Sequence, residues 1–183
     1  MPLPSIINKC QHVPIDVKNA ANNLTATSGL TISIGINGCL NKDYLWFYVY
    51  DEGIPFARVY SPSLKSANNA PKGCSSLQAE IYFSKFQPLK KTAKELVDET
   101  VHHLVNMGLF YKDQLIFAQP HFHKFANVIF DHHYHKSRKL VLDWLSEQKI
   151  AVAGRFGEWD YLWSGQSMRS GMNAADYIMG QIT

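Results

Sequence analysis

The sequence predicts an α+β fold, in which helices cover an antiparallel sheet and a strand, a loop and a helix close the chain. Strand-like stretches joined by short turns fill its first half, and a helical apolar stripe appears in its second half. A run of small residues closes the chain as a further helix. With 183 residues, 46% of them hydrophobic, the chain is long enough to bury a sizeable core.

The first half contains the strand signals. Residues 30–37 alternate between apolar and polar side chains, and 44–50 are rich in β-favouring aromatic residues, so 38–43 is expected to connect them as a hairpin. Two further strands are expected at 55–60 and 76–84, on either side of a loop at 61–73 that is rich in Asn, Pro, Ser and Lys. Consecutive strands with short connections pair antiparallel, which predicts a meander.

Helical periodicity is clearest in the second half. Helices are expected at 17–24, 89–107 and 137–148, and the second should cover the sheet. Short strands are expected at 115–119 and 125–130, around a polar turn at Pro120.

The segment 150–178 is the most informative part of the chain. An apolar run at 150–153 predicts a short buried strand that ends at Gly154, and a helix is expected to open near 165–167. The first turn of a helix presents unpaired backbone N–H groups and the positive end of the dipole, which suit an anionic or electron-rich group. This strand-to-helix crossover therefore predicts a ligand site.

The order of residues in this segment resembles the C-terminal flavin-binding signature of the FAD-dependent amine oxidase superfamily, in the branch of protoporphyrinogen oxidase-like proteins and UDP-galactopyranose mutase. The residues that carry the resemblance are Gly154, Arg155, Glu158, Tyr161, Gln166, Ser170, Gly171, Ala174 and Ala175. Stretches at 46–48, 55–59, 70–73 and 80–81 are similar to the substrate domain of the same family, more diffusely. One position departs from the pattern, because Gly165 stands where the family commonly has Asp.

The resemblance implies FAD as cofactor and a small molecule as substrate. Its implied flavin contacts are Gly154, Arg155, Gln166 and Ser167. Arg58 could clamp a substrate carboxylate or phosphate, or extend as an edge-strand charge into solvent. Trp46 and Tyr48 share a strand face and could line a substrate pocket. Packing in the core and a dimer contact are the alternatives for both residues. For Arg155, a surface ion pair with Glu158 is the alternative. The catalytic residues are not identified by the sequence.

The family's Gly-x-Gly-x-x-Gly turn, which binds the ADP half of FAD, does not occur in the chain, and Gly35-Ile36-Asn37-Gly38 lacks its third glycine. We therefore interpret the chain as the C-terminal portion of such an oxidoreductase, with a substrate-domain-like region at 1–149 and a flavin-facing segment at 150–183. The chain is then a fragment of such an enzyme, one subunit of a split enzyme in which a second chain supplies the ADP-binding half, or a descendant that has lost the cofactor. The alternative is a non-catalytic, dimeric binding module derived from such an enzyme.

Composition narrows the possible partners of the protein and its cellular compartment. A net charge of +3 with scattered basic residues argues against nucleic acid or a membrane as the main partner. Three distant cysteines and the lack of a signal core favour a cytoplasmic protein. Five histidines gather within 121–135, where metal ligation, a role beside the flavin and a solvated turn are all chemically open. We expect no metal site, since converging ligands are not evident from the sequence.

Overall fold

The computed structural model describes residues 1–182, and the chain divides into two compact units. One unit joins Met1–Ala26 to the C-terminal part of the chain from Asn127, and the other comprises Thr27–Ala126. The boundary between the two units is set by how compactly each part of the chain packs on itself. The division expected at residue 149 marks where the flavin-facing segment begins, and it stays a prediction.

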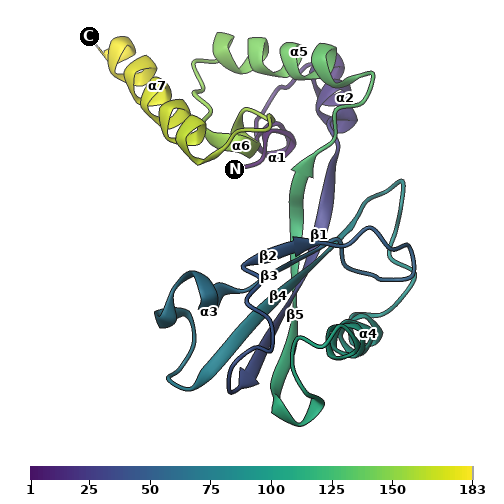
Figure 1. Cartoon of the computed structure of the whole chain (residues 1–183). Coiled ribbons are helices and arrows are strands. Elements are labelled where there is room, and N and C mark those ends of the chain that lie inside the picture. Colours follow the sequence, from purple (N-terminus) through teal and green to yellow (C-terminus); the bar gives the residue numbers. More distant parts are fainter. Residues whose placement is uncertain (183) are drawn as a thin grey trace. The chain divides into compact units, whose positions relative to one another are not determined.

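The unit formed by Thr27–Ala126 contains a five-stranded sheet of order β2-β3-β4-β1-β5 (Figure 1). Its strands are β1 (Ala26–Asn37), β2 (Trp46–Tyr48), β3 (Arg58–Tyr60), β4 (Cys74–Phe83) and β5 (Leu115–Val128). The pairs β1–β4, β2–β3 and β3–β4 are antiparallel. The α+β class with an antiparallel sheet is confirmed.

The expected hairpin at 38–43 is wrong, because β1 pairs with β4 and not with β2. Leu30 lies opposite Ile81, and Ile34 lies opposite Leu77, so the ten-residue ladder places both apolar sets on one face. The three-residue β2 offers far less apolar surface to pair with. Long complementary strands therefore override proximity in the sequence.

The expected break at Pro120 is also wrong, since β5 runs unbroken from Leu115 to Val128. β5 stands at the edge of the sheet, next to β1. A proline at an edge can direct its missing N–H position away from the ladder, so no sheet hydrogen bond is lost.

The helix α4 (Ala93–Asn106) covers one face of the sheet and begins at a capping box between Thr92 and Glu95. Leu96 and Leu104 are buried in the same core as the apolar face of β1 and β4. Short helical turns fill the connections of this unit: α3 (Pro62–Lys65), η1 (Ala67–Asn69) and η2 (Lys112–Gln114).

The second unit is helical. Its helices are α1 (Leu3–Ile7), α2 (Ile15–Asn23), α5 (Tyr134–Glu147), α6 (Gly154–Gly157) and α7 (Ser164–Ile182). α2 packs against α5, and α6 packs against α7. Val141 and Leu145, on the inward side of α5, are buried. The helices expected at 17–24 and 137–148 are thus confirmed within a few residues.

The strand expected at 150–153 is wrong, because these residues form an extended connection outside the sheet. Ile150 and Val152 are half-buried. A strand needs a neighbouring strand for its backbone groups, and none of the five strands in the described part of the chain pairs with this segment. Apolar character alone therefore does not produce a strand here.

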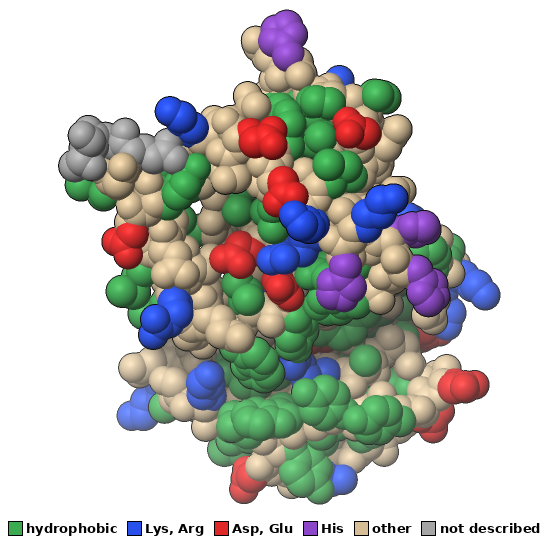
Figure 2. Space-filling model, turned by 90° about the horizontal axis from the view of Figure 1, so that it is seen from above, with side chains coloured by type: hydrophobic (Ala, Val, Ile, Leu, Met, Phe, Trp, Pro, Cys, Tyr) green, Lys and Arg blue, Asp and Glu red, His purple; other side chains and the backbone are tan. Residues whose placement is uncertain are grey.

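Charged side chains of both signs are interspersed on the face of the molecule seen in Figure 2. Within residues 1–182, no helix combines the length and the apolar character needed to cross a bilayer.

Candidate functional site

The corner at Gly154 lies between the extended segment 150–153 and the short helix α6. Gly154 has φ +77°, a left-handed conformation that favours glycine, and a Cβ built there would meet no atom within 4 Å. Its backbone N–H donates to Ser170 Oγ at 2.8 Å, and the Ser170 hydroxyl donates in turn to Glu158. The buried Ser170 side chain thus fixes the corner to α7.

Arg155 is held on two sides. Its NH2 group donates to Asn127 Oδ1 at 2.8 Å, and its guanidinium carbon lies 4.2 Å from the centre of the Tyr161 ring. Its Nε–H is buried and has no acceptor among the described residues. An oriented cation with one unused, buried donor is suited to an acceptor atom of a ligand.

The alternative of an ion pair between Arg155 and Glu158 is wrong. Glu158 instead faces Arg138 of α5: Arg138 NH2 lies 3.8 Å from Glu158 Oε2, and Arg138 Nε donates to the Glu158 carbonyl at 2.6 Å. Arg138 NH2 also lies 3.4 Å from Asp160 Oδ2. The Arg155 side chain is consequently left to Asn127 and Tyr161.

α5 also fixes the loop that follows α6. Tyr134 donates its hydroxyl to the carbonyl of Trp159 at 2.9 Å, and Trp159 is fully buried with φ +54°. Burial raises the pKa of the Tyr134 phenol, so the hydroxyl stays protonated and able to donate. Tyr134 and Arg138 therefore act as positioning residues for the segment that carries Arg155.

The N-terminus of α7 contains the two remaining predicted flavin contacts. Gln166 Oε1 accepts the Trp163 N–H at 2.8 Å, which makes Gln166 part of the helix cap. Ser167 N–H donates to the Trp163 carbonyl at 2.8 Å, while its half-buried hydroxyl has no partner among the described residues. The backbone N–H groups of residues 164–166 likewise lack acceptors in the described part, as expected for a first helical turn.

Arg58 belongs to the sheet of the other unit. Its Nε and NH2 groups donate to the two carboxylate oxygens of Glu80 at 3.1 and 2.7 Å, and Tyr82 donates its hydroxyl to the same carboxylate. The hydrogen bond to Glu80 raises the pKa of Arg58, so the guanidinium is permanently charged. Two of the three guanidinium nitrogens of Arg58 are therefore hydrogen-bonded to Glu80 on the neighbouring strand β4. The third nitrogen does not bond to Glu80.

Trp46 and Tyr48 lie on β2, at the edge of the sheet, opposite Tyr60 and Arg58. Their exposed fractions are 58% and 55%, so core packing is wrong for both. Tyr44 and Tyr50 flank the strand and are also exposed, and the Tyr48 and Tyr50 rings are stacked with their centres 6.4 Å apart. Such exposed rings can stack on a planar or sugar ligand, or contact another protein.

The histidines of 121–135 are divided between the two compact units. His121 and His123 lie on β5, whereas His132, His133 and His135 lie at the turn before α5 and in its first turn. Across residues 1–182, no three His, Cys, Asp or Glu side chains converge as metal ligands do.

No protein-family model and no curated protein sequence matches the chain. Solved structures do match. A structure of a reduced UDP-galactopyranose mutase superposes with a TM-score of 0.88 at 21% identity, over 99% of this chain and 41% of that one. The chain shares its fold with part of that protein. A putative protoporphyrinogen oxidase from Exiguobacterium sp. 255-15 superposes with a TM-score of 0.69 at 12% identity, over 98% of this chain and 40% of that one. The chain thus spans about two fifths of each.

The structure brings Gly154 and Arg155 into one hydrogen-bonded corner in the helical unit, and Gln166 and Ser167 into the first turn of α7. Sequence reasoning missed the positioning roles of Asn127, Tyr134 and Arg138. Asn127 is 28 residues from Arg155, and Arg138 is 20 residues from Glu158, so no local spacing could have revealed either contact.

Proposed function

We propose that the chain is the substrate-binding and flavin-contacting part of an FAD-dependent, amine oxidase-like oxidoreductase, incomplete without an ADP-binding half. The observation that carries the proposal is the buried Nε–H of Arg155, which lacks an acceptor next to the open backbone of Gly154. The similarity in fold to part of a UDP-galactopyranose mutase supports the same assignment.

The residues of the helical unit fit the pyrimidine edge of a flavin. Arg155 supplies a fixed positive charge and an unused donor, and the first turn of α7 supplies backbone N–H groups and the positive end of a 19-residue helix. Both stabilise negative charge that develops on a bound ring. When bound, the cofactor would accept a hydride from a C–H bond of the substrate, which oxidises an adjacent C–N or C–C bond, and these residues would orient the cofactor.

The sheet unit would take the substrate. Trp46 and Tyr48 offer exposed rings for stacking, and Arg58 can use its remaining N–H groups for a carboxylate or phosphate while Glu80 holds its plane. In this assignment Arg58 binds substrate and Glu80 is a positioning residue.

One observation bears both on this proposal and on the alternative of a non-catalytic, dimeric module. Met168, Met172 and Met179 of α7 have exposed fractions of 72%, 65% and 64%. An exposed apolar row on a long helix favours a partner, and that partner is either the completing half or a second copy of the chain.

Binding of flavins of different length tests the proposal. We expect riboflavin and FAD to bind the purified chain with similar, weak affinity, because the described residues offer contacts for the ring and no glycine-rich turn for the ADP half. Fluorescence quenching measures both affinities, and Arg155→Met should weaken both about tenfold, since hydrogen bonds to charged groups contribute roughly 1.5–3 kcal/mol.

Arg169→Met is the matched control, because Arg169 is exposed on α7 and forms no ion pair among the described residues. A strong preference for FAD over riboflavin would contradict the absence of an ADP site. A lack of binding by both flavins, together with a dimeric mass in light scattering, would favour the non-catalytic module.

A further inference from the structure

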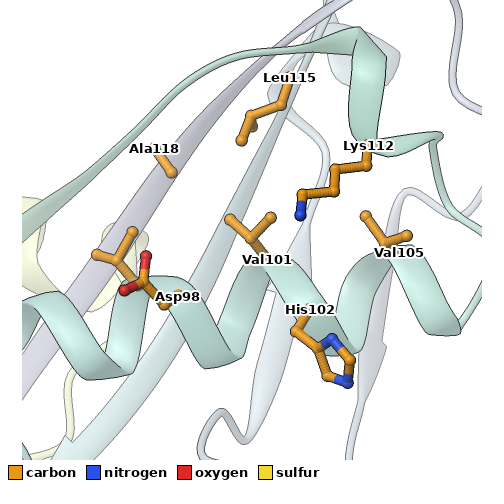
Figure 3. A pocket seen from close by; sticks show the side chains of 8 residues that line it. Asp98, Val101, His102, Val105, Lys112, Leu115 and Ala118 are labelled. Carbon is orange, nitrogen blue, oxygen red and sulfur yellow. The ribbon is translucent and has the colours of Figure 1, made fainter.

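A cavity of about 520 Å³ lies between α4 and β5, within the sheet unit and apart from the residues assigned to flavin or substrate (Figure 3). Its apolar wall comprises Val97, Val101 and Val105 of α4, with Leu115 and Ala118 of β5 facing them. All five side chains are half-buried. The volume lies within the range of small-molecule sites, roughly 300–1,000 Å³.

The valines form one continuous stripe. Positions 97, 101 and 105 are four residues apart, so they lie one above another on a single helix face. With a rise of about 1.5 Å per residue, the stripe is roughly 12 Å long, about the length of an extended chain of eight to ten carbons. The shape of the wall therefore suits a linear apolar group.

Two side chains of opposite charge border the cavity. Lys112 extends from η2 over the cavity, so that its ammonium group lies between Val101 and Val105, and Asp98 lies on the far side of Val101 (Figure 3). Neither Lys112 nor Asp98 forms an ion pair within residues 1–182. The His102 ring points away from the Lys112 ammonium and is hydrogen-bonded to Asn106 at 2.8 Å. A ligand therefore meets one ammonium group over the valine stripe and one carboxylate toward the end of the stripe near Asp98.

We propose that this cavity binds an aliphatic monocarboxylate of about eight to ten carbons. The carboxylate pairs with the Lys112 ammonium, and the chain lies along the valine stripe against Leu115 and Ala118. Asp98 disfavours ligands that carry a second anionic group at the far end. This site does not involve the flavin, so a negative result here leaves the proposed enzymatic function unaffected.

Octanoate below its micellar concentration is the probe. In ¹H–¹³C spectra of the full chain, we expect saturable shifts of the Val97, Val101 and Val105 methyl signals. Lys112→Met should weaken binding about two- to fivefold, since it keeps the apolar stem and removes the charge of an exposed ion pair. Lys72→Met, at an exposed lysine outside the cavity, should leave the affinity unchanged.

A ligand variant tests the charge pattern without altering the protein. Octanedioate should bind more weakly than octanoate, because it places a second anion near Asp98. Three results would each overturn the proposal: no saturable shift of the valine methyls, equal affinity for octanedioate and octanoate, or an unchanged affinity in Lys112→Met.

Discussion

Gly154 and Ser170 are 16 residues apart in the chain, and the backbone N–H of Gly154 donates to Ser170 Oγ at 2.8 Å. This hydrogen bond fixes the corner before α6 to the side of α7. Because Arg155 follows Gly154 directly, the same bond helps to set the direction of the Arg155 side chain. The predicted ligand site therefore depends on a serine that has no contact of its own with Arg155 among the described interactions.

Ser170→Ala should destabilise the protein by about 1–3 kcal/mol, because it leaves a backbone N–H and the Glu158 carboxylate without their partner. Urea denaturation measures the change. Ser167→Ala is the matched control: its hydroxyl has no partner in the described part, so stability should change by less than about 0.5 kcal/mol. Equal losses in the two variants would contradict the role given to Ser170.

Gly154→Ala should cost about 1–2 kcal/mol, because φ +77° is strained for any residue with a Cβ. A Cβ at this position meets nothing within 4 Å, so the cost comes from the backbone alone. Gly171→Ala, within α7 and equally open, should instead stabilise the protein by roughly 0.5–1 kcal/mol. Thermal unfolding of both variants gives the comparison, and a change of the same sign in both would refute this explanation.

Phe117 lies directly over Gly35, since a Cβ built on Gly35 would stand 2.3 Å from a ring atom of Phe117. Gly35→Ala should therefore displace the ring, with a loss of about 1 kcal/mol. In Phe117→Ala the same glycine substitution should be nearly neutral. A double-mutant cycle measures this coupling, and additive effects of the two substitutions would show that the ring does not contact Gly35.

The Thr92 capping box lowers the pKa of Glu95, chiefly through the hydrogen bond from the Thr92 backbone N–H and then through the Thr92 hydroxyl. A lowered pKa in the folded state means that this contribution to stability is present above the ordinary glutamate pKa and is lost as the pH falls through the lowered value. Thr92→Val removes the hydroxyl and should raise the pKa of Glu95 toward its ordinary value. A carboxyl ¹³C titration by NMR checks the direction, and an unchanged pKa would contradict it.

The sequence identified elements whose signals are local. The apolar stripe of α4 and the alternation of β1 each follow from residues within a few positions of one another. Pairing required information from distant positions, so the partner of β1 was wrongly expected to be β2. The strand predicted at 150–153 was wrong for a related reason, because its apolar residues have no strand beside them in the described part.

In the candidate site, too, local features were predictable from the sequence and long-range contacts were not. Gly154 was recognisable as a glycine directly after an apolar run, and the structure gives it a positive φ. The contacts of Arg155 with Asn127, and of Arg138 with Glu158, bridge α5 or the end of β5 to the loop after residue 150, so only the folded chain reveals them. Arg58 was singled out for a free fork, and Glu80 on the neighbouring strand occupies that fork.

We propose that this chain contacts a flavin and that a partner completes it. The decisive measurement is a titration with FAD, followed by flavin fluorescence with and without a cell fraction that contains the completing half. We expect weak binding by the chain alone, tight binding with the fraction, and a loss of the tight phase in Arg155→Met but not in Arg169→Met. Tight binding by the chain alone, or no binding in either case, would refute this proposal.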